Sequence, residues 1–253
     1  MYLNIGDGNL WILDMSRQIP SKFTTSPGLK GSPVWSLDGV TILYRTSPQN
    51  GVPGGIFEKS ASGAGEERLF YNAAVNGPSQ ISPDGKWLLF FANPAGESVQ
   101  DIFVLPMTGE KKPQAIVQSP FGDVEPQFSP DGKFVAWAST ATGGYEVYVQ
   151  PFPATGDRWP VSNSGGRQPM WRPDGKELFF VSEARKFYSV EVRPGPTFDY
   201  DAPKFLFDIP ADVFNARNSY IPGPDGQRFL VNMSLDSTPP PIHIVRNWTA
   251  GFK

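Results

Sequence analysis

Two acidic residues, Asp123 and Glu125, lie two positions apart just ahead of a strand-like run. Two carboxyl groups about 5–9.5 Å apart across a cleft could cleave a glycosidic bond, one as the acid and the other as base or nucleophile. The alternative interpretation is an ordinary solvated loop, because no spacing rule singles out this pair. The two residues therefore keep open an enzymatic function, as a glycosidase or lyase, without establishing it.

The only histidine, His243, is the next candidate for proton transfer. It occupies the middle of a strand-like segment, at a position that aromatic residues fill in five similar segments: Trp11, Phe57, Phe103, Tyr148 and Tyr188. A Ser-His-Asp triad would also need a nucleophile, and the chain contains no Gly-x-Ser-x-Gly motif. One histidine and no cysteine give little support for zinc. We therefore predict that His243 is a packed strand residue and that the chain has no catalytic residue, cofactor or metal.

A four-residue turn that ends in Asp-Gly recurs five times. The copies are Ser36-Leu37-Asp38-Gly39, Ser82-Pro83-Asp84-Gly85, Ser129-Pro130-Asp131-Gly132, Arg172-Pro173-Asp174-Gly175 and Gly223-Pro224-Asp225-Gly226, with aspartates 46, 47, 43 and 51 residues apart. Proline presets φ, aspartate bonds the backbone just ahead of it, and glycine accepts a conformation that other residues resist. Calcium would instead need several oxygens converging at about 2.3–2.6 Å, and these aspartates occur one per repeat. We predict a structural role for them.

Strand-like runs flank each turn. Residues 127–128 and 134–137, around the third turn, are examples rich in aromatic and β-branched side chains. The segment that carries His243 or its aromatic counterpart recurs six times, at steps of 46, 46, 45, 40 and 55 residues, and a further strand follows it in most repeats. Four short strands in each repeat of about 40–50 residues are typical of β-propeller blades. A β-sandwich offers no reason for such a near-constant interval.

We therefore predict an all-β fold: a six-bladed β-propeller of four-stranded antiparallel blades, with incomplete first and last blades. The prediction is a single domain, residues 1–253, with a partial blade at 1–30, blades at about 31–76, 77–123, 124–166 and 167–216, and a last blade at 217–253. Residues 1–5 either pair with the segment around residues 10–12 or close the ring by joining the last blade.

The composition argues against several classes of protein. The net charge is −3, the pI is about 5.3, and lysine and arginine are dispersed, without the basic patch of a nucleic-acid binder. No apolar run approaches the roughly 18 residues that a membrane helix needs, and residues 1–13 do not resemble a secretory signal. We expect no nucleic-acid partner and no direct membrane insertion. The absence of cysteine does not assign a compartment.

Several segments carry a resemblance to a known family. They are Leu10–Asp14, Pro33–Ser36, Gln127–Gly132, Glu146–Pro153, Trp171–Phe179 and Asn247–Gly251. The chain resembles the TolB-like, WD-repeat-like propellers of bacteria over nearly its whole length. It is most similar to the C-terminal propeller behind bacterial eukaryotic-like serine/threonine kinase domains, and Tyr148–Pro153 and Asn247–Gly251 are more discriminating than the repeated turn. Leu37, in place of the first turn's proline, departs from the pattern.

The resemblance implies a sensor module in a periplasmic or other extracytoplasmic location, downstream of a kinase domain and a membrane span. The chain itself lacks the Gly-rich ATP loop, the His-Arg-Asp catalytic loop and the Asp-Phe-Gly motif, so kinase activity is not assigned to it.

Polar residues at the entry to the expected innermost strands form a candidate ligand site. Loops held by a rigid scaffold often carry binding sites, and these would line one mouth of a propeller's channel. The candidates are Ser32, Asp123, Glu125, Arg167, Gln168, Arg217, Asn218 and Ser219. An ordinary solvated rim is the alternative.

With no catalytic constellation, the sequence favours a non-catalytic binding or sensor propeller that recognises a protein, a peptide or a small molecule. By resemblance it would be the C-terminal module of a kinase-like receptor. Two alternatives stay open: a propeller enzyme that uses Asp123 and Glu125, and a purely structural spacer.

Overall fold

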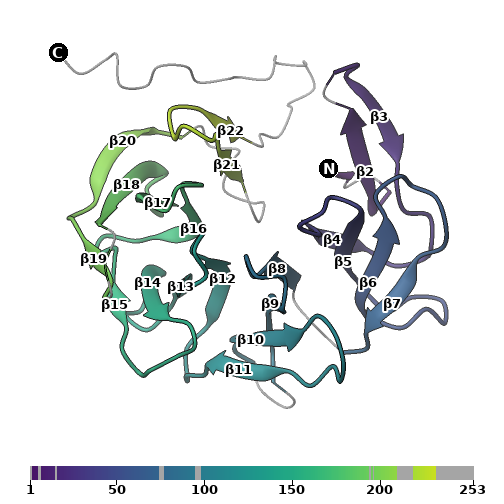
Figure 1. Ribbon diagram of the computed structural model, residues 1–253, viewed down its shortest axis with the longest axis horizontal. Coiled ribbons are helices and arrows are strands. Elements are labelled where there is room, and N and C mark those ends of the chain that lie inside the picture. Colours follow the sequence, from purple (N-terminus) through teal and green to yellow (C-terminus); the bar gives the residue numbers. More distant parts are fainter. Residues whose placement is uncertain are drawn as a thin grey trace. The chain divides into compact units, whose positions relative to one another are not determined.

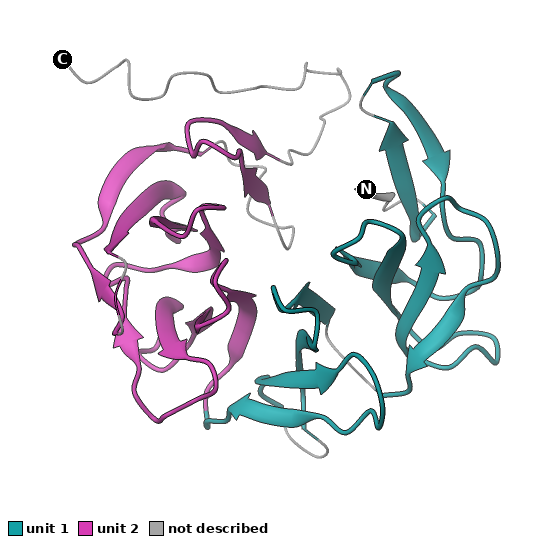
Figure 2. Ribbon diagram, viewed as in Figure 1, with its two compact units in different colours: residues 1–120 teal, residues 121–253 magenta. Residues whose placement is uncertain are grey.

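The computed structural model describes residues 2–4, 7–14, 16–73, 77–94, 98–193, 195, 197–209 and 219–231. Every regular element among them is a β-strand, and the strands pair in antiparallel sheets (Figure 1). This part of the chain contains no helix with the length and apolar character needed to cross a membrane. The chain divides into two compact units, residues 1–120 and residues 121–253 (Figure 2).

Unit 1 contains three sheets whose strands follow one another in the sequence. The first consists of β1 (Tyr2–Asn4), β2 (Asn9–Asp14) and β3 (Ile19–Lys22). The second consists of β4 (Lys30–Trp35), β5 (Thr41–Thr46), β6 (Gly55–Ser60) and β7 (Arg68–Tyr71). The third consists of β8 (Gly77–Ile81), β9 (Trp87–Ala92), β10 (Asp101–Pro106) and β11 (Gln114–Val117).

Unit 2 also consists of antiparallel sheets whose strands follow one another in the sequence. Its first sheet consists of β12 (Asp123–Phe128), β13 (Phe134–Ser139), β14 (Glu146–Pro151) and β15 (Trp159–Pro160). The next consists of β16 (Arg167–Trp171), β17 (Glu177–Val181), β18 (Lys186–Arg193), β19 (Asp199–Tyr200) and β20 (Lys204–Asp208), in which both β19 and β20 pair with β18. A hairpin of β21 (Tyr220–Pro222) and β22 (Phe229–Val231) follows.

Apolar side chains pack between consecutive sheets of each unit. In β17, Leu178 and Phe180 join a cluster shared with the β12–β15 sheet, whereas Phe179 and Val181 join one shared with β21 and β22. Because successive residues of a strand point to opposite faces, a continuous apolar run covers both faces of a sheet. Unit 1 has two corresponding clusters, one on each face of the β4–β7 sheet.

Three of the five repeated turns share one pattern of side-chain hydrogen bonds. In the β8–β9 turn, the Ser82 hydroxyl donates to Asp84 Oδ1 at 2.6 Å, which keeps the pKa of Asp84 below its usual value. Oδ1 also accepts the Lys86 amide N–H at 3.1 Å, and Ser82 Oγ accepts the Trp87 N–H at 3.0 Å. The β4–β5 and β12–β13 turns repeat these bonds. All five turn aspartates accept an amide N–H two residues further on, which is the local role predicted from the sequence.

The structure confirms an all-β chain built from successive antiparallel sheets, several of them four-stranded. Of the two arrangements considered for residues 1–5, it shows the hairpin: β1 pairs with β2, with Tyr2 opposite Trp11. The count of six blades and their boundaries stay predictions. His243 and the Asn247–Gly251 segment lie outside the described residues.

Candidate functional site

Three of the predicted binding residues share an uncommon backbone conformation. Ser32, Glu125 and Gln168 have φ values of 51°, 57° and 54°, and each lies six residues before a turn aspartate. Each also lies where the pairing of the first and second strands shifts register, as in a β-bulge. A positive φ costs a residue with a Cβ about 1–2 kcal/mol. Surrounding contacts must therefore hold these residues in place.

In unit 2 these bulged residues bond to the next first strand along the chain. Glu125 Oε2 accepts the Gln168 amide N–H at 2.9 Å, and Glu125 Oε1 forms an ion pair with Arg167 Nη2 at 2.8 Å. Gln168 Oε1 accepts the Ser219 N–H at 3.0 Å, and the Gln168 carbonyl accepts the Tyr220 hydroxyl at 2.7 Å. One chain of hydrogen bonds therefore joins β12, β16 and the residue before β21. It satisfies backbone N–H groups that would be costly to bury without partners.

The acidic pair considered for glycoside cleavage is engaged in the same region. Asp123 is 1% exposed and accepts a hydrogen bond from Trp137 Nε1 at 3.0 Å. Glu125 is buried against Arg167, whose guanidinium also lies over the Tyr145 ring at 4.2 Å from its centroid. Both carboxylates therefore have structural partners.

The predicted site residues fall into three groups. Glu125, Arg167, Gln168 and Ser219 come together in unit 2, with Asp123 on the same strand as Glu125. Ser32 belongs to unit 1. Arg217 and Asn218 lie outside the described residues.

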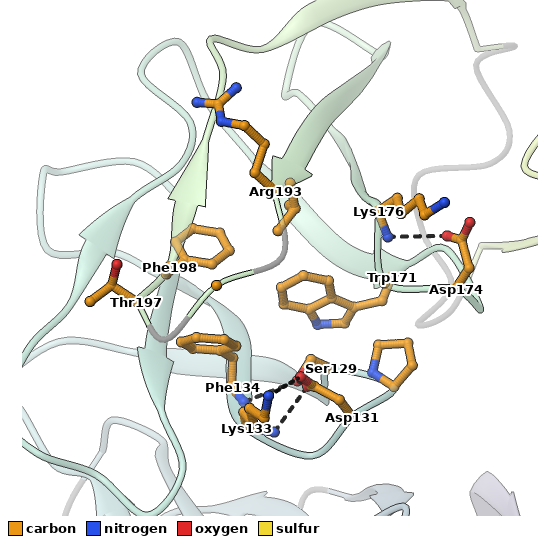
Figure 3. A pocket seen from close by; sticks show the side chains of 14 residues that line it. Ser129, Asp131, Lys133, Phe134, Trp171, Asp174, Lys176, Arg193, Thr197 and Phe198 are labelled. Atoms are coloured by element: carbon orange, nitrogen blue, oxygen red, sulfur yellow. Dashed lines mark hydrogen bonds and ion pairs between the residues drawn. The ribbon is translucent and has the colours of Figure 1, made fainter.

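A separate cavity of about 320 Å³ lies between the β12–β15 and β16–β20 sheets of unit 2 (Figure 3). Residues of the β12–β13 and β16–β17 turns line it, together with the end of β18 and the residues that lead into β19. Three aromatic rings border this space, from Phe134, Trp171 and Phe198 (Figure 3). The centroids of Phe134 and Trp171 lie 5.5 and 6.1 Å from that of Phe198. This cavity, called the aromatic pocket below, is at the small end of the range of about 300–1,000 Å³ for ligand sites.

The aromatic pocket contains an unpartnered hydrogen-bond donor. Trp171 is 8% exposed, and its buried Nε1–H has no hydrogen-bond partner among the described residues. Buried tryptophans usually find a partner for this group, and leaving a donor unsatisfied costs about 1–3 kcal/mol. In Figure 3 the nitrogen-bearing edge of the indole lies toward the turn that carries Ser129 and Asp131. To satisfy this donor, an acceptor atom of a ligand would have to reach a nitrogen that is shielded from solvent in this structure.

Most charged side chains around the aromatic pocket are engaged with protein partners. Hydrogen bonds from Arg172 lower the pKa of Asp174 to about 2, and Arg193 forms ion pairs with two aspartates. Lys133 lies 3.5 Å from Asp131. By contrast, the exposed Lys176 ammonium makes no ion pair or side-chain hydrogen bond with any residue that the structure describes.

This pocket was not predicted from the sequence, where Phe134 belongs to a strand-like run, Trp171 begins one of the segments that carry the family resemblance, and Phe198 has no assigned role. The sequence does contain one signal, because 17 residues separate Tyr188 from Phe205, against 11 between Tyr148 and Trp159 in the preceding repeat. The longer connection contains β19 and supplies the Phe198 ring.

No family model matches the chain, and no curated protein matches its sequence. Solved structures match its fold. TolB from Acinetobacter baumannii is 20% identical with a TM-score of 0.67, over 88% of this chain and 53% of that one. The chain thus spans about half the length of that protein.

Two further structures match most of the chain. The β-propeller domain of Cps50 (Swd1) from Myceliophteria thermophila is 13% identical, with a TM-score of 0.64, over 95% of this chain and 78% of that one. Oligogalacturonate lyase from Vibrio parahaemolyticus is 12% identical, with a TM-score of 0.60, over 95% of this chain and 69% of that one. These likenesses show the fold alone, which is that of TolB-like and other β-propellers. Because a lyase is among them, function has to be argued from the site.

Proposed function

We propose that this chain is a six-bladed propeller that binds a ligand without catalysing a reaction. The observation that carries the proposal is the aromatic pocket, in which three rings border a cavity next to a buried, unpartnered indole N–H. Pockets lined by aromatic side chains with a few polar groups are typical of binding sites for small molecules. A protein or peptide could present the same chemistry through a single side chain.

One candidate nucleophile of the aromatic pocket, the Ser129 hydroxyl, is already engaged in its own turn. Covalent or acid–base catalysis requires a nucleophile or a proton-transfer group that can reach the reacting atoms. The Ser129 hydroxyl is committed to its turn, since it donates to Asp131 Oδ1 at 2.7 Å and accepts the Phe134 N–H at 3.0 Å. The alternative site for catalysis, Asp123 and Glu125, is held by Trp137 and Arg167.

We further propose that the binding module is the C-terminal, extracytoplasmic sensor of a kinase-like receptor. This part of the proposal is supported by the sequence resemblance, above all by the segment Tyr148–Pro153, which contains the last four residues of β14 and the two that follow it.

A thermal-shift screen of metabolites and short peptides tests the binding function, with the wild-type chain and a Trp171→Phe variant side by side. We expect at least one compound to raise the melting temperature of the wild type and to have a smaller effect on the variant. A panel of glycosidase and lyase substrates is run in parallel. Turnover that disappears in Asp123→Asn or Glu125→Gln would replace the binding proposal with the enzymatic alternative.

A further inference from the structure

The unpartnered groups at the aromatic pocket define a chemical class of ligand, an inference that rests on the binding function proposed above. We propose that the pocket binds a small carboxylate attached to a single six-membered ring. Two of the lining groups, the Trp171 indole N–H and the Lys176 ammonium, make no hydrogen bond or ion pair with any of the described residues. Both are hydrogen-bond donors, so the complementary ligand must supply acceptors.

The charge of Lys176 selects an anion over a neutral acceptor. The carboxylates that line the pocket form their hydrogen bonds and ion pairs with other groups, and Asp174 acts on the Lys176 ammonium only as a nearby charge, without an ion pair. Asp131 Oδ1 accepts the Ser129 hydroxyl and the Lys133 N–H, and both oxygens of Asp174 bond to Arg172. A ligand carboxylate would pair with Lys176 and accept from an N–H donor, which is the stronger, charge-assisted type of hydrogen bond.

The aromatic rings and the volume of the pocket indicate the size and ring structure of the ligand. Faces of aromatic rings carry partial negative charge and attract the C–H edges of another ring. Phe134, Trp171 and Phe198 present such surfaces around the cavity (Figure 3). A volume of about 320 Å³ equals roughly ten water molecules at about 30 Å³ each, which is enough for one substituted six-membered ring.

Two sources share this chemistry, aromatic acids and sugar acids. Benzoate and glucuronate are probes for them, and each has a neutral partner that keeps the ring, namely benzamide and glucose. Titration calorimetry of the full chain with the four compounds measures the contribution of the charge. We expect one of the acids to bind about fivefold or more tightly than its neutral partner, and the acid that binds identifies the source.

Three variants locate the binding site. Lys176→Gln should weaken binding of the acid about two- to fivefold, the usual effect of an exposed ion pair. Trp171→Phe keeps an aromatic ring but removes the donor, and it should weaken binding about fivefold or more. Lys86→Gln is the matched control, because Lys86 occupies the same position of the β8–β9 turn in unit 1 and should leave affinity unchanged. Since Lys176 is exposed, its variant tests the proposal even where Trp171→Phe perturbs folding.

The outcomes separate this inference from the proposed function. Equal binding of an acid and its neutral partner, or an unchanged affinity in Lys176→Gln, overturns the carboxylate class and leaves the binding function in place. Failure of both acids to bind also overturns the class. The binding function fails as well only where the broader screen finds no ligand that depends on Trp171.

Discussion

Two hairpins of this chain, β4–β5 in unit 1 and β16–β17 in unit 2, share a local pattern but differ in their surroundings. Each has a tryptophan three residues before the turn aspartate, and a residue with positive φ three residues before that tryptophan. Trp171 of the second hairpin is 8% exposed, whereas Trp35 of the first is 44% exposed. Similar local structure therefore leads to a buried ring in one place and an exposed ring in the other.

The difference comes from the connection that follows the third strand of each sheet. After β18 the chain supplies Phe198, whose ring packs edge-on against Trp171 at 6.1 Å and 82°. After β6 the connection reads Ala-Ser-Gly-Ala-Gly-Glu-Glu over residues 61–67 and contains no aromatic ring. The first turn also exposes Leu37 and Val40, by 61% and 58%, where the other hairpin has Pro173 and Lys176. The pocket thus requires the long connection in addition to the hairpins that line it.

The largest expected effect comes from removing the ring that covers Trp171. Phe198→Ala should lower the free energy of unfolding by about 3 kcal/mol or more, because Phe198 is nearly buried and its loss leaves a cavity. Trp35→Ala should cost about 1 kcal/mol or less, since that ring is already partly in water. Urea unfolding monitored by circular dichroism measures both. Equal losses for the two variants would contradict the comparison.

Glycine at the two bulges should produce effects of opposite sign. Ser32→Gly removes the cost of a positive φ and should raise the free energy of unfolding by up to about 1 kcal/mol. Gln168→Gly also removes that cost but leaves the Ser219 N–H without its acceptor, and should lower the free energy of unfolding by about 1 kcal/mol. Thermal and urea unfolding of the two variants provide the test. A gain in stability for Gln168→Gly would show that its hydrogen bond adds nothing.

Asp174 and Asp38, the turn aspartates of the two hairpins, should contribute to stability with a different dependence on pH. Hydrogen bonds from Arg172 lower the pKa of Asp174 to about 2, so its stabilising effect is complete above the unfolded pKa of about 4 and is lost as pH falls toward 2. Asp174→Asn should cost at most about 1 kcal/mol at pH 7, because the ion pair is exposed. The cost should shrink between about pH 5 and pH 2. Asp38, whose pKa is lowered by the Ser36 hydroxyl, has no arginine partner within the described part of the chain and should show a smaller change when replaced by asparagine. Unfolding measured across this pH range distinguishes them.

The smallest effect should come from exchanging the second residue of each turn. Leu37→Pro should raise the free energy of unfolding by about 0.4–1 kcal/mol, because proline restricts the unfolded chain and the Leu37 N–H makes no hydrogen bond within the described residues. Pro173→Leu should lower it by a similar amount. Denaturant midpoints of the two variants measure these shifts. A loss of stability in Leu37→Pro would mean that the first turn differs in backbone from the others.

Much of the fold could be predicted from short segments. The turn around Asp84 could be recognised because Ser82, Asp84 and Gly85 bond to one another and to nearby backbone. The interactions that define the turn therefore lie within a few residues of the sequence. The strands could be recognised because a run such as Leu178–Val181 is apolar on both faces, as a sheet packed on both sides requires.

The candidate site was harder to predict because its contacts join distant segments. The sequence indicated polar residues at the strand entries, and Glu125 and Gln168 do lie there. Their side chains, however, accept hydrogen bonds from amides 43 and 51 residues further along the chain. No local sequence pattern predicts such long-range partners. The direction of a side chain at a bulge depends on the neighbouring strand, so a group expected to face a ligand can instead join two sheets.

The amino-acid sequence by itself determined the repeating turns, the short strands and the two-sided apolar pattern, because these arise from φ preferences and side-chain alternation within a few residues. The tertiary structure alone decided that Trp171 is covered while Trp35 is exposed, and that Glu125 and Gln168 bond to the following strands. The physical reason is that burial and hydrogen-bond pairing depend on which distant segments pack against a residue. The aromatic pocket exists because residues from two sheets and one long connection meet around the Trp171 ring.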